Sequence, residues 1–190
     1  MRIGIDIDDT ITNSMETILP SICEYYNLDY EKEIKQKHSY HYYHTLDNFS
    51  DYAKKHYDNL LCNVPLKDDA NYYINKLKSM GNEIIFITAR SEWGFKNPYK
   101  LSKEYLDRHN IKYDKLIIGA KDKATICKRE KIDVFIDDDI VNCSKVEKEN
   151  IKVLLFDNYY NIDEEKFDRV YSWEEIYTKL QELADKIKQT

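Results

Sequence analysis

The chain has 190 residues, of which 42% are hydrophobic and 34% are charged. This balance is typical of a globular protein with a real core and excludes a disordered chain. With only 4 glycines and 3 prolines, collagen-like and proline-rich classes are excluded as well. The formal net charge of −6 argues against binding along a nucleic acid, although a local positive pocket could still hold a small anion.

The chain shows no targeting or membrane signal. It turns acidic at Asp6, so a secretory signal peptide does not fit, and it has no apolar run of about 18 residues that would span a membrane. The 4 cysteines form no CxxC pair, and we expect free thiols in a reducing compartment. We therefore predict a cytoplasmic protein without membrane contacts. Monomer and homodimer both remain open.

Five short runs rich in Ile, Val, Leu and Phe predict strands, and their nearly continuous apolar character is typical of parallel strands buried on both faces. These runs are residues 2–7, 83–88, 115–118, 133–136 and 152–156. Helical patterns separate them at residues 67–80, 101–109, 122–131 and 173–188. The alternation predicts an α/β fold with a Rossmann-like parallel sheet and right-handed crossovers.

Residues 14–64 interrupt this alternation. They contain no strong strand signal, and their apolar positions indicate one helix around residues 18–26 and another over 52–61. We predict a small α-helical cap inserted after the first strand, with residues 1–13 and 65–190 forming the core. The segment holds 9 of the 25 aromatic residues, which either stack on a substrate's ring or pack the small core of the cap.

The strongest chemical signal is the run Asp6-Ile7-Asp8-Asp9-Thr10, directly after the first predicted strand. Residues i and i+2 of a strand point the same way, so Asp6 and Asp8 both face the crevice at the strand's carboxyl end. Two close carboxylates need a cation or a proton between them, and Mg²⁺ fits. The alternative is an acidic turn in which Asp and Thr only cap the next helix.

A second acidic run, Asp137, Asp138 and Asp139, also follows a predicted strand. Three acids at one strand end are costly without a metal. The alternative is the start of a helix, where acids are favourable in the first turn.

Two further signals are weaker on their own. Thr88, followed by Ala89 and Arg90, ends a predicted strand, and a hydroxyl with the next backbone N–H groups can hold a phosphate oxygen. Lys123, with Lys121 two residues before it, begins a predicted helix and would neutralise phosphate charge. The alternatives are an ordinary strand-to-helix turn and solvated surface lysines.

The four signals follow one another in the chain as an acid pair, a threonine, a lysine and an acid cluster. This order resembles the motif order of the haloacid dehalogenase (HAD) superfamily of phosphotransferases, and the resemblance covers residues 1–13 and 65–160. Within it, the chain is most similar to the 5'(3')-deoxyribonucleotidase group and its bacterial relatives. The insertion directly after the first motif, the run Asp122-Lys123-Ala124 and the Ile-Asp-Asp ending carry this resemblance. The chain departs from the group at Asp9, where glycine is usual, and at Ala89-Arg90, where animal members have a Ser-Pro-like pair.

The resemblance implies that Asp6 is the nucleophile that forms an aspartyl phosphate, and that Asp8 is the general acid and base. It further implies Mg²⁺ held by Asp6, the backbone carbonyl of Asp8, and Asp138, with Asp137 as a ligand either directly or through water. Asp139 would instead cap the following helix.

The same resemblance implies that Thr88, Ala89 and Lys123 bind the transferring phosphoryl group, with Lys121 as the substitute if the register differs. Arg90 is assigned to the phosphate or to bracing the acid cluster, and the sequence does not choose between them.

These features predict a Mg²⁺-dependent phosphatase of a small phosphate monoester, with a nucleoside monophosphate as the expected substrate. A sugar phosphate or a nucleic-acid 3'-phosphate end is the alternative. A basic groove for nucleic acid is disfavoured because residues 14–64 contain five lysines, no arginine and eight acids. A catalytically silent binding protein is the remaining alternative, and the unbroken set of motif residues argues against it.

Overall fold

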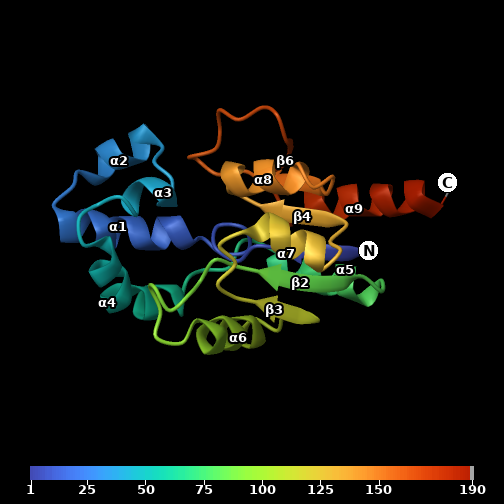
Figure 1. Ribbon diagram of the computed structural model, residues 1–190, viewed down its shortest axis with the longest axis horizontal. Coiled ribbons are helices and arrows are strands. Elements are labelled where there is room, and N and C mark those ends of the chain that lie inside the picture. Colours follow the sequence, from blue (N-terminus) through green and yellow to red (C-terminus); the bar gives the residue numbers. More distant parts are fainter. Residues whose placement is uncertain (189–190) are drawn as a thin grey trace.

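The computed structural model describes residues 1–188, with side chains through residue 186, so the last two residues of the predicted core range lie outside the described residues. It contains one sheet in the order β3-β2-β1-β4-β5-β6, with every neighbouring pair parallel (Figure 1). The predicted α/β class with a parallel sheet is confirmed. The strands are β1 (Arg2–Ile5), β2 (Glu83–Ile87), β3 (Lys115–Ile117), β4 (Val134–Asp137), β5 (Lys152–Phe156) and β6 (Asp168–Val170).

Helices cover both faces of the sheet. They are α5 (Ala70–Ser79), α6 (Pro98–Arg108), α7 (Lys123–Arg129), α8 (Ile140–Glu147) and α9 (Trp173–Lys188). Alternate residues of one strand pack on opposite faces: Ile84 and Phe86 of β2 join the cluster that contains α5, α6 and α9, whereas Ile85 and Ile87 join the cluster of α7 and α8. This burial on both faces explains why the strands read as continuous apolar runs.

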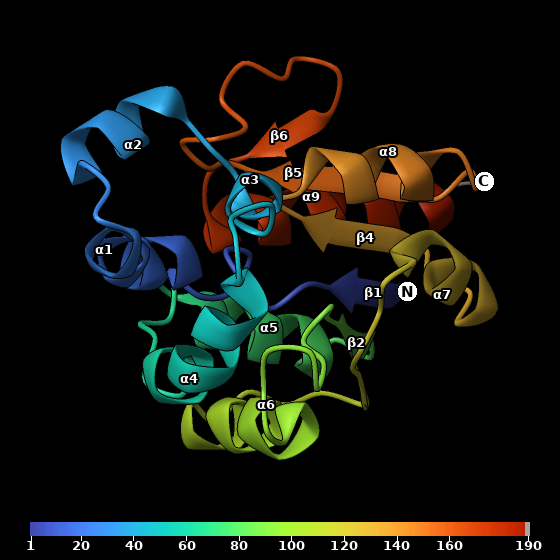
Figure 2. The same ribbon diagram turned by 60° about the vertical axis from the view of Figure 1, so that its left-hand side comes forward.

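Four helices lie between β1 and α5 in the chain, and they are called the inserted helices below. They are α1 (Ser14–Tyr26), α2 (Tyr30–Gln36), α3 (Tyr40–Tyr43) and α4 (Phe49–Leu61). Figure 1 shows them beyond one end of the sheet, and Figure 2 shows α3 and α4 near the ends of the central strands. The predicted helices near residues 18–26 and 52–61 correspond to α1 and α4. The shorter α2 and α3 were not predicted.

Several element boundaries differ from the predicted ones for local reasons. Helix α5 begins three residues later than predicted because Leu66 bridges to Thr12, and the Lys67 N–H donates to the Ile11 carbonyl at 2.9 Å. Helix α6 begins three residues earlier because the Asn97 side chain caps it by accepting from the Lys100 N–H at 2.9 Å.

Strand β6 was not predicted at all. It has three residues and lies at the edge of the sheet, and only Val170 is buried. A half-exposed edge strand needs no apolar run, so the sequence carries no signal for it. No helix in the described residues is long and apolar enough to cross a membrane.

Candidate active site

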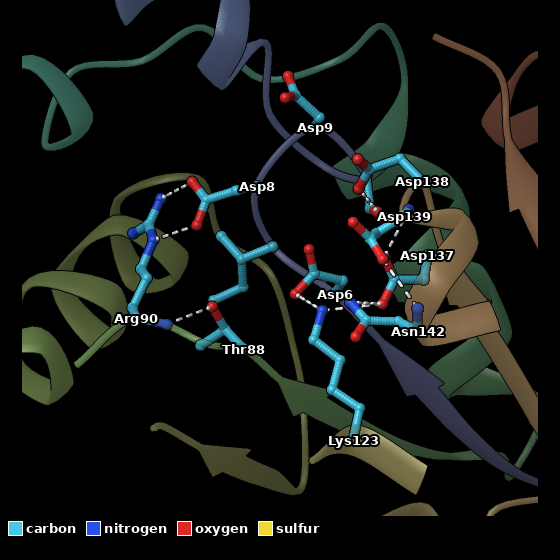
Figure 3. A network of polar contacts seen from close by, with 12 residues as sticks. Asp6, Asp8, Asp9, Thr88, Arg90, Lys123, Asp137, Asp138, Asp139 and Asn142 are labelled. Atoms are coloured by element: carbon cyan, nitrogen blue, oxygen red, sulfur yellow. Dashed lines mark hydrogen bonds and ion pairs between the residues drawn. The ribbon is translucent and has the colours of Figure 1, made fainter. Parts of the chain in front are cut away.

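Asp6 lies where β1 ends, at the centre of a buried ionic cluster (Figure 3). Lys123, the first residue of α7, reaches it from the neighbouring layer: Lys123 Nζ lies 2.7 Å from Asp6 Oδ1 and 2.8 Å from Asp137 Oδ2. All three side chains are almost completely buried. Lys123, and not Lys121, is therefore the lysine that pairs with the acids at the strand ends.

Asp137 and Asp138 end β4 and start the turn beyond it, and they differ in their partners. Asp137 has three donors: besides Lys123, it accepts from the Asp139 N–H at 2.9 Å and the Asn142 side-chain amide at 3.2 Å. Among the described side chains, the Asp138 carboxylate accepts only from hydroxyl groups, which are those of Thr10 at 3.0 Å and of Tyr160. Asp138 is thus the freer of the two to bind a metal.

Asp6, Asp137 and Asp138 each place one carboxylate oxygen within 4.8 Å of the others, the arrangement of a cation site. Burial, together with the nearby Asp137 and Asp8, raises the pKa of Asp6 to about 8, although Lys123 opposes this shift. Burial and the neighbouring acids also raise the pKa of Asp138 well above its usual range. One lysine does not balance these carboxylates, so a divalent cation with oxygen ligands fits this donor set.

Asp8 follows β1 on the other side of Asp6 and pairs with Arg90, which follows β2 (Figure 3). Arg90 Nε donates to Asp8 Oδ2 at 2.8 Å and Arg90 Nη2 to Asp8 Oδ1 at 2.7 Å, and the Ser14 hydroxyl also donates to Oδ1 at 2.6 Å. Burial alone would raise the pKa of Asp8, but the charge and hydrogen bonds of Arg90, with the Ser14 bond, hold it below its usual range. Asp8 is therefore a carboxylate in this arrangement.

The turn after β2 brings the second predicted motif to the same edge. Thr88 is buried beside Asp6 and Asp8, and its hydroxyl accepts from the Arg90 backbone N–H at 3.2 Å. Ala89 is exposed, and both residues line the cavity that contains Asp6. The loop is anchored because the Ala120 N–H donates to the Thr88 carbonyl at 2.9 Å. The structure thus brings every predicted site residue to one cavity.

That cavity has a volume of about 220 Å³ and two different walls. The strand ends contribute the acids, Lys121, Lys123 and Arg90, whereas the far wall is mainly aromatic. Its aromatic and apolar members come from the inserted helices and from the loop after β2: Tyr40, His44, Tyr57, Leu61, Trp93 and Phe95.

Helix α3 also contacts the acidic edge directly. His41 Nε2 of α3 lies 2.8 Å from Asp139 Oδ2. The other oxygen of Asp139 accepts from the Asn142 N–H at 2.8 Å, so Asp139 caps α8 as predicted. Two segments that are far apart in the sequence therefore meet beside the cavity.

Two residues of this network were not predicted from the sequence. Tyr160, in the loop between β5 and β6, donates from its hydroxyl to Asp138 and, at 3.0 Å, to Asp9. Asn161 anchors that loop by donating to the carbonyl of Asp138 at 2.8 Å. Neither residue stands near a motif in the chain, so only the fold reveals them. Asp9 itself has a positive φ of 58°, a conformation that suits the glycine usual there.

Residues 1–187 match the family described as "5' nucleotidase, deoxy (Pyrimidine), cytosolic type C protein". The chain belongs to this family. A nucleotidase of Clostridium acetobutylicum is 32% identical over 195 residues, which cover 98% of this chain and 96% of the relative. The predicted resemblance to HAD nucleotidases is thereby confirmed.

Two solved structures share the fold. One, described as a predicted phosphatase from Clostridium acetobutylicum, has a TM-score of 0.70 at 17% identity and covers 95% of this chain and 98% of its own. The other is a HAD hydrolase from Bacillus subtilis bound to magnesium, with a TM-score of 0.62 at 14% identity and coverage of 95% and 98%. This nucleotidase family member is a HAD-superfamily phosphoric monoester hydrolase, and its substrate is a small phosphate monoester.

Proposed function

We propose that the protein is a Mg²⁺-dependent phosphatase of deoxyribo- or ribonucleoside monophosphates that works through an aspartyl phosphate on Asp6. The observation that carries this proposal is the position of Asp6, which shares one cavity with a paired lysine, a freer carboxylate at Asp138 and an aromatic wall. The family description names a deoxy nucleotidase, which supports a nucleotide over a sugar phosphate.

In this proposal, a carboxylate oxygen of Asp6 attacks phosphorus while the bond from phosphorus to the ester oxygen breaks. Asp8 first takes up a proton from solvent as substrate binds and gives it to that leaving oxygen; the resulting carboxylate later takes a proton from the water that attacks the phosphorylated Asp6. The released phosphate and the free Asp6 carboxylate restore the starting state. Lys123 orients Asp6 and compensates charge on the phosphoryl group, to which Thr88 and the backbone at Ala89 donate hydrogen bonds.

The metal would be held by Asp6, the backbone carbonyl of Asp8 and Asp138, with Asp137 at the edge of the set because Lys123 and Asn142 donate to its Oδ2 and the Asp139 N–H donates to its Oδ1. When bound, Mg²⁺ supplies the positive charge that lets a carboxylate approach a phosphate dianion. Magnesium in the Bacillus subtilis relative of the same fold supports this choice of ion.

We further propose that residues 14–64 act as a cap over the core formed by residues 1–13 and 65–190. The aromatic wall that the inserted helices share with Trp93 suits the face of a nucleobase, and base stacking on an aromatic ring contributes ~1–3 kcal/mol. Contact of His41 with Asp139 supports closure over the site, which excludes water from the charged groups. The family description names a cytosolic protein, and we propose that this chain acts in the cytoplasm.

Phosphate release from a panel of monoesters tests this function. The panel contains deoxy- and ribonucleoside monophosphates, sugar phosphates and a 3'-phosphorylated oligonucleotide, each measured with Mg²⁺ and with EDTA. We expect Mg²⁺-dependent turnover of nucleotides that is lost in Asp6→Asn. Turnover confined to sugar phosphates or to the oligonucleotide would overturn the nucleotide assignment, and turnover that survives in EDTA would overturn the metal.

A further inference from the structure

Arg90 forms two parallel hydrogen bonds to Asp8, which a single charged atom could not form. Two of its nitrogens face the two oxygens of the carboxylate, at 2.8 and 2.7 Å. In the described part of the chain, Asp8 is the one carboxylate within ion-pair distance of Arg90. A bidentate pair of this kind fixes the plane of the carboxylate as well as its position.

Arg90 is itself held rigidly. Its backbone carbonyl accepts from the Gly119 N–H at 2.8 Å, and its backbone N–H donates to the Thr88 hydroxyl at 3.2 Å. Its guanidinium lies over the ring of Phe95, 5.6 Å from the centroid. The guanidinium is therefore held in a fixed position beyond the end of β2, and its hydrogen bonds set the position of the Asp8 carboxylate.

Asp8 needs such support because of its place in the chain. Strand β1 ends at Ile5, so Asp8 stands in a turn and not in the regular ladder of the sheet. Its side chain is 20% exposed to the cavity, whereas that of Arg90 is 1% exposed. Both residues line the cavity, but the carboxylate is the more exposed of the two and the guanidinium is almost completely buried.

We propose that Arg90 is a positioning residue for the proton-transferring carboxylate of Asp8 and does not bind the phosphoryl group. This inference rests on the proposed function, in which Asp8 gives a proton to the leaving oxygen. Arg90 and Ser14 together hold the Asp8 carboxylate with three hydrogen bonds, and misplacement of a catalytic group by about 1 Å can cost about 10²-fold in rate.

The two roles of Arg90 predict different dependence on the leaving group. An alkyl ester such as a nucleotide releases a strongly basic alkoxide, which needs a proton as the bond breaks, whereas p-nitrophenyl phosphate releases a stable phenolate that does not. Loss of a positioned acid therefore slows alkyl esters selectively. Loss of a phosphate contact slows both esters, because both carry the same phosphoryl group.

The experiment compares wild type, Arg90→Lys, Ser14→Ala and Asp8→Asn on p-nitrophenyl phosphate and on the alkyl monoester of the panel that wild type hydrolyses fastest. For Arg90→Lys we expect kcat on the alkyl ester to fall by about 10- to 10²-fold, up to the lower end of the contribution of general acid catalysis, because Asp8 itself remains. We expect less than about 3-fold on the aryl ester, with KM and inhibition by inorganic phosphate unchanged. Asp8→Asn should slow the alkyl ester selectively and to a greater degree. The double variant with Asp8→Asn and Arg90→Lys should be no slower than Asp8→Asn alone.

Ser14→Ala keeps the test decisive if the arginine variant does not fold, because it removes a different contact to Asp8 and should show a weaker form of the same selectivity. Ser102→Ala is the matched control: Ser102 lies 3.5 Å from Arg90 Nη1 and does not bond Asp8. Equal losses on both esters with weaker phosphate inhibition would overturn the proposal in favour of direct phosphate binding. Unchanged kinetics in Arg90→Lys and Ser14→Ala would also overturn the proposal, because the Arg90–Asp8 pair would then have only a structural role.

The wild-type measurements judge the proposed function separately. If wild type hydrolyses only sugar phosphates among the alkyl esters, the nucleotide assignment fails, yet the comparison of leaving groups still decides the role of Arg90.

Discussion

The two walls of the cavity satisfy their polar groups in different ways. At the strand ends, each buried acid and base has partners within the chain, as Asp6, Lys123 and Asp137 show. In the inserted helices, by contrast, lie all four buried side-chain polar atoms that have no partner among the described residues, on Tyr40, Tyr52, His56 and Tyr57. Buried polar groups without a partner are uncommon and need an explanation such as a ligand or water.

This difference indicates which wall serves the reaction and which wall serves the selection of the substrate. The strand ends are preorganised, because parallel strands and the helices packed on them hold the charges in place. The inserted helices supply apolar area and two cavity-lining tyrosines, Tyr40 and Tyr57, whose buried hydroxyls have no partner among the described residues. Variants at the strand ends should therefore change the reaction itself, whereas variants of the aromatic wall should change which substrate is accepted.

The largest effect is expected for Asp6→Asn, which removes the attacking carboxylate at the preorganised wall. Loss of a nucleophile lowers kcat by on the order of 10³- to 10⁶-fold, measured as phosphate release under saturating substrate. Asp133→Asn is the control, since Asp133 accepts from the Arg2 N–H at the opposite end of β4 and is not among the residues that line the cavity. Activity above about 10% of wild type in Asp6→Asn would remove Asp6 from the role of nucleophile.

Tyr160→Phe tests whether the charged wall depends on hydroxyl support from the β5–β6 loop. It removes the bond to Asp138 and leaves the ring in place, so Mg²⁺ affinity should fall by about 10- to 100-fold. Titration calorimetry and the Mg²⁺ dependence of turnover measure this change. Tyr159→Phe is a matched control, because the Tyr159 hydroxyl donates to the His38 carbonyl, outside the acid cluster. An unchanged dissociation constant in Tyr160→Phe would show that Asp138 needs no such support.

Trp93→Ala tests the aromatic wall. Trp93 is 42% exposed and lies 5.0 Å from the ring of His44, so we expect the lower end of the stacking contribution, about 5- to 10-fold in KM for nucleotides. Inhibition by inorganic phosphate should not change, since phosphate carries no ring. If KM for nucleotides stays at the wild-type value, the aromatic wall does not hold the base.

The smallest effect is expected at the contact between the walls. The hydrogen bond to Asp139 raises the pKa of His41, against the effect of burial. Because its folded-state pKa is raised, the contact stabilises the protein fully below the usual value of 6.5 and loses this contribution as the pH rises through the raised value.

We expect His41→Gln to lower the Tm by about 1–2 °C at pH 6 and by less at pH 9, since the imidazole is largely exposed. Thermal unfolding of both proteins at several pH values measures the difference. A difference that grows with pH would contradict the sign of the shift.

The sequence alone was enough to predict the α/β class, five of the six strands and the residues that meet at their ends. The reason is physical. Strands buried on both faces must be apolar along their whole length, and the carboxyl ends of neighbouring parallel strands share one edge. Acids at two such ends, after β1 and β4, therefore meet in any fold of this topology. The short motifs at the strand ends were also enough to predict the superfamily.

Tertiary structure alone decided which charges pair and what covers them. Lys121 and Lys123 are both near the acids in sequence, but only Lys123, at the start of α7, reaches Asp6. Arg90 had two candidate roles, and the packing of the β2 loop beside β1 placed it on Asp8. Tyr160 comes from a loop more than 20 residues beyond Asp138. Such contacts depend on side-chain reach between segments that are distant in the chain, which neither periodicity nor local spacing encodes.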